Sequence, residues 1–251
     1  MYELYDLREN FLYYNDFYLT AKEKSYSEAS RKHNISQSSL TRSISKLENL
    51  LDLKLVNTSN KGFELYNTTP TVKLASYMLK DELNNLGINA LVEERPVIKE
   101  IKKQGLPYHY SYDISNKYCK EIKEKYPSII YFIDLHRDSA TYEMTTCKYE
   151  GKSYAKILFV LGMEFESYGE NEKMINYLNE KLKSINPCLS RGVSKKSGKG
   201  VNGIYNEDFD KNLILIEVGG QYNNIIEVSN TLEIFAKILS LYINEDNNEK
   251  T

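Results

Sequence analysis

Cysteine is scarce in this sequence, and its arrangement excludes two kinds of cross-linked fold. Only Cys119, Cys147 and Cys188 occur among 251 residues, and no two of them have a C-x-x-C spacing. An odd number without such a spacing indicates neither a disulfide framework nor a cysteine zinc site. A chain of this length can bury a core without disulfides, and we expect a reducing compartment.

Long apolar runs and a positively charged leader are also absent. The first residues, MYELYDLR, carry acidic side chains where a signal peptide needs positive charge. No segment approaches the roughly 20 apolar residues of a membrane-spanning helix. We therefore expect a cytoplasmic protein without a membrane partner. The net charge of -2 does not itself indicate nucleic-acid binding, but DNA affinity depends on where the cations lie.

Hydrophobic periodicity separates the chain into two regions. Residues 1–52 have the 3.6-residue apolar spacing of consecutive short helices, and 53–67 resemble two short strands around an Asn-Lys-Gly turn. From about residue 70, helices and apolar strands alternate, which indicates a mainly parallel sheet. We expect helices at 72–86, 114–125, 171–185 and 224–243, and strands at 88–94, 129–135, 155–162 and 212–218.

The segment between Ser25 and Leu51 has the parts of two helices joined by a short turn. Ser25 and Glu28 have capping-box spacing, and Ala29 is small enough for two helices to cross closely. In the second helix, apolar residues recur on one face: Leu40, Ile44, Leu47 and Leu51. The opposite face then exposes Gln37, Ser38, Thr41, Arg42, Ser45 and Lys46. Such side chains suit base edges and phosphates, although an ordinary amphipathic helix has the same pattern.

This segment resembles the signature of the LysR-type regulators. The resemblance is carried by Ser25-Tyr-Ser-Glu-Ala29, Ile35-Ser-Gln-Ser-Ser-Leu-Thr41, Ile44-Ser-Lys-Leu-Glu48 and Leu51-Asp-Leu-Lys-Leu55-Val56. It implies a winged helix-turn-helix at residues 1–66, double-stranded DNA as partner, and a homodimer paired through the helix at 70–86. It places DNA contacts at Gln37, Ser38, Ser39, Thr41, Arg42 and Lys46, beside the exposed Ser45.

The expected wing departs from the LysR pattern at one point. The family usually carries an arginine just after the first strand of the wing, where this chain has Asn57-Thr58. Phosphate anchoring by the wing, at residues 57–63, is therefore expected to depend on Lys61 alone. Each neutralised phosphate adds a salt-dependent increment to DNA affinity, so we expect weaker binding than in the family and a need for dimerisation.

The second region, residues 67–251, resembles another family through six ordered motifs. They are Asp134-Leu-His-Arg-Asp138, AKILFVLG at 155–162, NPCLSRGV at 186–193, YNED at 205–208, LIEVGG at 215–220, and Asn223 with Glu227. These motifs are similar to those of the stage II sporulation protein P family of zinc-dependent N-acetylmuramoyl-L-alanine amidases. The resemblance implies an α/β domain, a peptidoglycan or muropeptide ligand, and zinc. The fold class is thus α+β overall, with a mainly α first domain and the helix at 70–86 as connector.

A catalytic zinc needs about three protein ligands and a carboxylate that takes a proton from water. By resemblance His136 matches a zinc ligand and Glu217 the general base, and parallel strands would bring both to one sheet edge. The family takes its first ligands from a His-Thr-His-rich strand that this chain lacks. Zinc binding would then need His109, His136 and a carboxylate such as Glu93 or Glu94, although an isolated loop histidine is more often structural.

Simpler roles remain open for the same residues. Asp134, Arg137 and Asp138 have the composition of an ion-pair cluster that holds a strand end. Glu217 lies close enough to Gly219 and Gly220 to satisfy loop amides. The run RGVSKKSGKGVNG at 191–203 lacks the spacing of a phosphate-binding loop and is predicted to be a solvated loop.

Two functions of different classes follow from these patterns. The first is a DNA-binding transcription regulator whose amidase-like second domain senses a ligand or dimerises without catalysis. The second is a zinc-dependent amidase of peptidoglycan that has acquired a helix-turn-helix. DNA lies inside the membrane and the wall outside it, and no export signal is visible, so the compartment favours the regulator. A chimeric product whose domains do neither task is the third alternative.

Overall fold

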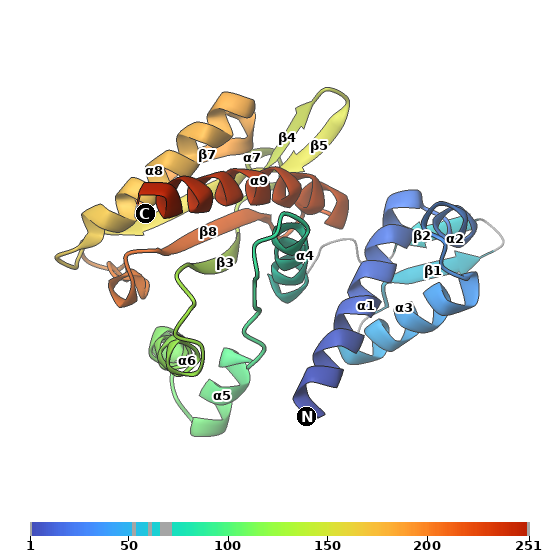
Figure 1. Cartoon of the computed structure of the whole chain (residues 1–251), viewed down its shortest axis with the longest axis horizontal. Coiled ribbons are helices and arrows are strands. Elements are labelled where there is room, and N and C mark those ends of the chain that lie inside the picture. Colours follow the sequence, from blue (N-terminus) through green and yellow to red (C-terminus); the bar gives the residue numbers. More distant parts are fainter. Residues whose placement is uncertain (1, 52–53, 60–61, 66–71, 250–251) are drawn as a thin grey trace.

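The computed structural model describes residues 2–51, 54–59, 62–65 and 72–249 (Figure 1). Its first part has the predicted order of three helices and a wing: α1 (Tyr2–Glu23), α2 (Tyr26–His33), α3 (Gln37–Leu51), β1 (Val56–Ser59) and β2 (Gly62–Leu65). The two strands of the wing pair antiparallel, with Val56 opposite Leu65. The predicted winged helix-turn-helix architecture is therefore present.

Local signals in the sequence explain the bend between α2 and α3. Ser25 caps α2, because its hydroxyl accepts a hydrogen bond from the backbone N–H of Glu28 at 3.3 Å. Asn34 ends that helix in the left-handed conformation, at φ 55°. On α3, Leu40, Ile44 and Leu47 are buried as predicted; the side chain of Leu51 lies outside the described residues.

A four-stranded sheet organises the second part of the chain. Its strands are β3 (Phe132–Asp138), β8 (Leu213–Gly220), β6 (Ile157–Gly162) and β7 (Ser190–Lys196), in that spatial order. β3 pairs parallel with β8 and β6 parallel with β7, whereas the central β6–β8 pair is antiparallel. The sheet is therefore mainly parallel. A separate hairpin joins β4 (Thr146–Tyr149) to β5 (Lys152–Ala155).

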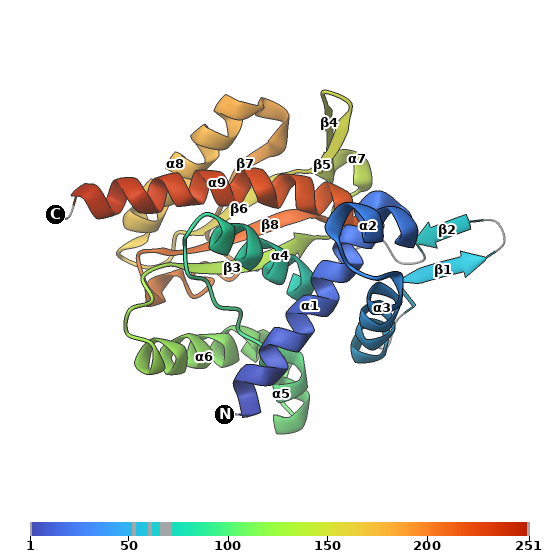
Figure 2. The ribbon, with the colours of Figure 1, turned by 45° about the vertical axis from the view of Figure 1, so that its right-hand side comes forward.

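Helices cover one face of this sheet. α4 (Val72–Asn85), α8 (Tyr168–Ile185) and α9 (Ile225–Glu249) share a buried core with alternate residues of the strands, such as Phe159 and Ile216. Two further helices, α5 (Val97–Gln104) and α6 (Ser111–Lys125), lie on the other side of the sheet (Figures 1 and 2) and have a small core of their own. The remaining helical segments are short: η1 (Tyr108–Tyr110), α7 (Tyr142–Thr145), η2 (Pro187–Leu189) and η3 (Glu207–Phe209).

Three local predictions were wrong. Residues 88–94 form no strand, and the expected loop before Pro107 contains α5. The first half of the expected loop at 191–203 is the edge strand β7, whose polar sequence SRGVSKK is only partly buried and has no apolar periodicity. The structure also joins Cys147 to Cys188 by a disulfide, contrary to the expectation from cysteine spacing. These two residues come from β4 and η2, which only the fold brings together.

The two parts of the chain share a buried contact along α1, which lies between α3 and α4 (Figure 2). The rings of Tyr14 on α1 and Tyr77 on α4 stack with centroids 5.0 Å apart. Leu74 of α4 and Ile225 of α9 belong to the same core. The apolar face of α4, expected to pair two copies, is thus used within one chain. None of the described helices combines the length and apolar character of a membrane span.

Candidate nucleic-acid interface and sheet-edge cluster

The polar face of α3 is exposed along the whole described length of the helix. Ser43, by contrast, is buried with the apolar residues and packs toward α1. Every α3 residue that the sequence placed at a DNA contact is exposed: Gln37, Ser38, Ser39, Thr41, Arg42, Ser45 and Lys46. We call these seven residues the α3 polar face. The packing of α3 thus agrees with the buried and exposed sides that periodicity predicted.

The beginning of α3 is held by serine hydroxyls. The Ser36 hydroxyl accepts a hydrogen bond from the backbone N–H of Ser39 at 3.1 Å, and it lies 3.0 Å from the Ser38 hydroxyl. Thr41 donates its hydroxyl hydrogen to the carbonyl of Gln37 at 2.9 Å. The N-terminal end of a helix favours anions, because its backbone N–H groups and dipole present partial positive charge. This end of α3 therefore suits a DNA backbone.

Acidic partners neutralise several of the cations near α3. Arg31, Lys32 and Lys54 pair with Glu28, Glu23 and Glu48, respectively. Arg42 is exposed and has no ion-pair partner among the described residues. Lys46 donates a hydrogen bond to the Tyr13 hydroxyl at 2.7 Å, which fixes the lysine against α1. Lys61, the expected phosphate contact of the wing, lies outside the described residues.

Glu48 has a role that sequence analysis missed. Its carboxylate accepts hydrogen bonds from the backbone N–H groups of Leu55 and Val56 at 2.9 and 3.2 Å. Although burial raises the pKa of Glu48, the hydrogen bonds from Lys54 and from these amides lower it. Glu48 thus attaches the start of the wing to α3 and sets where the wing begins.

The second cluster lies at the edge where β3 and β8 end. His136 and Glu217 are direct partners in the parallel register, so both strand ends share one edge, as predicted. Neighbouring residues of a strand point to opposite faces. Leu135 and Ile216 enter the helix-covered core, so His136 and Glu217 project from the opposite face. Asp134 and Asp138 have the same parity as His136 and lie on that face.

Charged groups in this cluster compensate one another. His136 Nε2 lies 3.0 Å from Asp134 Oδ1. Burial lowers the pKa of His136, but the hydrogen bond and charge of Asp134, with the charge of Glu217, raise it above its ordinary value. Burial also raises the pKa of Glu217, and the adjacent Asp138 raises it further. The arrangement favours a protonated imidazole between carboxyl groups.

The simpler roles considered for these residues are realised only in part. Asp138 forms an ion pair with Arg191 of β7 and also accepts the backbone N–H of Ala140 at 2.9 Å. Arg137, the expected partner, is exposed. Asn223, rather than Glu217, accepts the backbone N–H of Gly220, at 2.7 Å. The ion-pair cluster therefore exists with a different arginine.

Three further residues near this edge were not predicted as site residues. Tyr112 of α6 is close enough to Asp134 and Glu217 for their charges, after burial, to raise its pKa. Its ring contacts the Tyr205 ring edge to face, with centroids 5.6 Å apart. Glu207 is 1% exposed, and burial raises its pKa to about 8. The YNED motif at 205–208 marked two of these positions without indicating their roles.

Comparison with protein families decides the affiliation of the second part. The family described as stage II sporulation protein P matches residues 54–240, which is more than half of the chain. The chain belongs to the stage II sporulation protein P family. Residues 15–71 match the family described as bacterial regulatory helix-turn-helix protein, lysR family. The two matches overlap at the wing, as the sequence motifs had indicated.

One curated relative is stage II sporulation protein P of Bacillus subtilis (strain 168). It is 35% identical over 169 residues, which cover 67% of this chain and 42% of the relative. The chain therefore spans about two fifths of the length of the curated relative that it matches. No solved structure matches the chain.

The described residues do not fit the zinc ion that the amidase resemblance implies. No group of three or more His, Cys, Asp or Glu side chains in the described part of the chain is arranged to hold a metal. His109 lies exposed in η1, with its ring against Tyr110. Glu93 is bound by Arg95, and Glu94 lies near Tyr14. The conjectured site of His109, His136 and Glu93 or Glu94 is therefore not assembled.

Proposed function

We propose that this chain is a LysR-type DNA-binding transcription regulator that places α3 in the major groove of duplex DNA. The observation that supports this most is the α3 polar face, which stays exposed while the apolar side of the helix is buried. The match to the lysR helix-turn-helix family supports the same role. Regulation of transcription requires access to DNA, so the proposal includes a cytoplasmic location.

The chemistry of the α3 polar face suits both parts of a DNA site. Gln37, Ser38 and Ser39 lie at the start of α3, the end that contacts base edges in helix-turn-helix proteins. Amide and hydroxyl groups donate and accept hydrogen bonds, as base edges in the major groove require. Arg42 and Lys46 follow one turn later and would bind the flanking phosphates.

We further propose that the chain divides near residue 66, with α4 as connector, and that the second domain acts without catalysis. Its amidase-like fold would serve as a ligand-sensing or dimerising module in a homodimer. The neutralised sheet edge supports this division of roles, because Asp138 and His136 already have partners there. A muropeptide or peptidoglycan fragment is the proposed class of ligand, from the family resemblance.

Hydrolysis of peptidoglycan by an N-acetylmuramoyl-L-alanine amidase is the second candidate function. One observation favours it: His136 and Glu217, the expected ligand and base, are adjacent in the register of β3 and β8. Zinc would supply a water nucleophile in such an enzyme, but the described residues lack a third ligand. The regulator is therefore the function that we propose first.

Selection from a pool of randomised duplexes tests the proposal for any operator sequence. Full-length protein is expected to retain and enrich a specific set of sequences. Arg42→Ala should retain far less DNA, whereas Lys120→Ala, which removes an exposed cation on α6, should behave like the parent protein. Enrichment of no sequence, or equal enrichment by Arg42→Ala, contradicts the assignment. Digestion of purified cell wall by the same preparation would support the amidase instead.

A further inference from the structure

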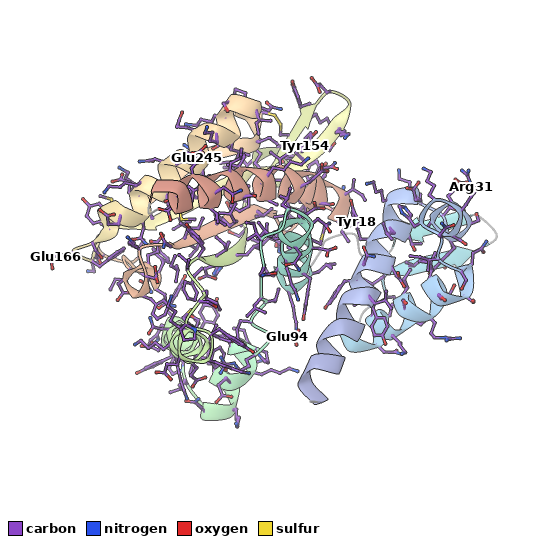
Figure 3. The ribbon with its side chains drawn as sticks, in the orientation of Figure 1. Tyr18, Arg31, Glu94, Tyr154, Glu166 and Glu245 are labelled. Atoms are coloured by element: carbon purple, nitrogen blue, oxygen red, sulfur yellow. A yellow bond between two sulfur atoms is a disulfide. The ribbon has the colours of Figure 1, made fainter. Side chains whose placement is uncertain are left out.

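A recess of about 380 Å³, open to solvent, lies where α1 meets α4 and α9. Three tyrosine rings and two carboxylates contribute to its lining: Tyr14, Tyr18, Tyr77, Asp81 and Glu82. Tyr18 projects from α1 on the side that faces α4 (Figure 3). The recess thus lies at the contact between the DNA-binding unit and the stage II sporulation protein P domain.

The two carboxylates in this recess are poorly compensated. Neither Asp81 nor Glu82 forms an ion pair among the described residues, although both are partly buried. Burial raises the pKa of Asp81, and burial with the charges of Glu233 and Asp81 raises that of Glu82. A cation placed between them would stabilise their charged forms.

The tyrosine rings already attract ammonium groups from the chain itself. The amino group of Lys22 lies 5.6 Å from the centroid of the Tyr18 ring, and that of Lys80 lies 5.9 Å from the Tyr77 ring. Contacts of this kind are favourable because the face of an aromatic ring is electron-rich. The walls of the recess are therefore chemically suited to a second, external ammonium group.

A buried hydroxyl gives independent evidence for a ligand. Tyr77 is 1% exposed, and its hydroxyl has no hydrogen-bond partner among the described residues. Its ring is held by stacking against Tyr14, and the residue lines the recess. A buried hydroxyl without a partner costs free energy, which a ligand that donates a hydrogen bond would recover.

We infer that this recess binds a small organic cation, a primary amine or short diamine. Asp81 and Glu82 would hold its ammonium group, the Tyr77 hydroxyl would accept one of its hydrogens, and the tyrosine rings would cover its alkyl part. Such a site combines concavity, apolar walls and few convergent polar groups.

Helix α1 connects this site to the α3 polar face, so the bound amine regulates DNA affinity. On its other side α1 holds α3 through the hydrogen bond from Lys46 to Tyr13 and through that between Asp16 and Ser43. A ligand changes DNA affinity only if it binds the DNA-competent arrangement of α1 differently from the alternative. This regulatory part, unlike the binding site itself, rests on the proposed function.

Calorimetric titration of the full chain with 1,4-diaminobutane, in the absence of DNA, tests the site. We expect saturable binding that weakens at least about tenfold in Asp81→Asn/Glu82→Gln and in Tyr77→Phe. Tyr77→Phe removes a hydroxyl that has no partner among the described residues, so the fold should persist. Asp113→Asn/Glu124→Gln on the exposed side of α6 makes the same charge change and should bind like the parent. The neutral 1,4-butanediol should not bind.

Three results would overturn the inferred site: no binding of the diamine, equal affinity in Asp81→Asn/Glu82→Gln, or equal affinity for the diol. For regulation, saturating diamine should change duplex affinity about fivefold, and Tyr77→Phe should remove the change. An unchanged duplex affinity overturns the regulatory role. A chain that binds diamine but no DNA contradicts the proposed function and leaves the site standing; one that binds DNA but no diamine contradicts this inference alone.

Discussion

The α3 polar face and the β3–β8 edge are both polar, but their charged groups are used differently. Arg42 on α3 has no ion-pair partner among the described residues, whereas Asp138 binds Arg191 and Asp134 binds His136 at the sheet edge. A surface that binds another molecule keeps groups available for it, and a cluster of mutually paired charges holds strands in place. Family likeness was clear for both regions, so only their local pairing separates an interface from a structural remnant.

The largest effect is expected from removing the cations of the α3 polar face. Arg42→Ala/Lys46→Ala should abolish retention of duplex DNA, a loss of about 100-fold or more, because each such contact contributes about 1–3 kcal/mol. Fluorescence anisotropy with a labelled duplex measures this. Tyr13→Phe removes only the hydroxyl that binds Lys46 and controls for a shifted lysine. Unchanged affinity in the double variant would remove the contrast between the two regions.

The ion pair at the sheet edge is expected to matter for stability. Arg191→Ala leaves the mostly buried Asp138 carboxylate without its cation and should lower the free energy of unfolding by about 2–4 kcal/mol at pH 7. Arg191 lowers the pKa of Asp138 although burial raises it. The pair therefore stabilises the fold above the unfolded pKa of about 3.9, and its contribution is lost as pH falls through the lowered value.

Urea unfolding at pH 7 and at pH 3 checks this prediction. The difference between the parent and Arg191→Ala should shrink at the lower pH, and Arg191→Lys should lose less than the alanine variant. A variant that unfolds like the parent at pH 7 would show that the pair is not structural, and the sheet edge would then regain interest as a binding site.

Glu207 provides a smaller effect with a defined pH dependence. Its carboxyl, with a pKa of about 8 in the folded chain, stays protonated after the unfolded chain has ionised. Stability is therefore full below about pH 4.5 and is lost as pH rises toward about 8. Glu207→Gln should match the parent at pH 4.5 and exceed it at pH 8 by a few kcal/mol, measured by urea unfolding. Parallel curves for both proteins contradict a buried neutral acid.

No effect at all is expected from His136→Ala on metal content. Elemental analysis of the purified parent protein should give less than about one zinc per chain, since the described residues contain no three-ligand group. Purified cell wall should likewise not be cleaved. Stoichiometric zinc that disappears in His136→Ala would restore the amidase as the better candidate.

The predictability of this fold differs between its elements for physical reasons. The helices of the first part and the strands β3, β6 and β8 have strong apolar periods, since one side or both are buried. The edge strand β7 has polar residues on its partly exposed sides, and α5 is only eight residues long, so neither has a readable period. The segment at 88–94 is apolar enough for a strand but has none as a neighbour.

The candidate sites were predictable to the extent that they lie on one element. The α3 polar face follows from helical spacing within fifteen residues. The register of His136 with Glu217 followed from the assumption of a parallel sheet, because equal ends of parallel strands meet. Arg191, Tyr112 and Glu207 reach the sheet edge from three distant segments, and no local pattern in the sequence connects them.

The central claim is that the first domain binds duplex DNA through α3, and the salt dependence of binding tests it most directly. Anisotropy titrations of the full chain with the selected duplex, from about 50 to 200 mM salt, should give a logarithm of the affinity that falls linearly with the logarithm of salt concentration. Arg42→Ala should reduce that slope by about one. Absence of saturable binding at the lowest salt concentration, or a slope that Arg42→Ala leaves unchanged, would contradict the account.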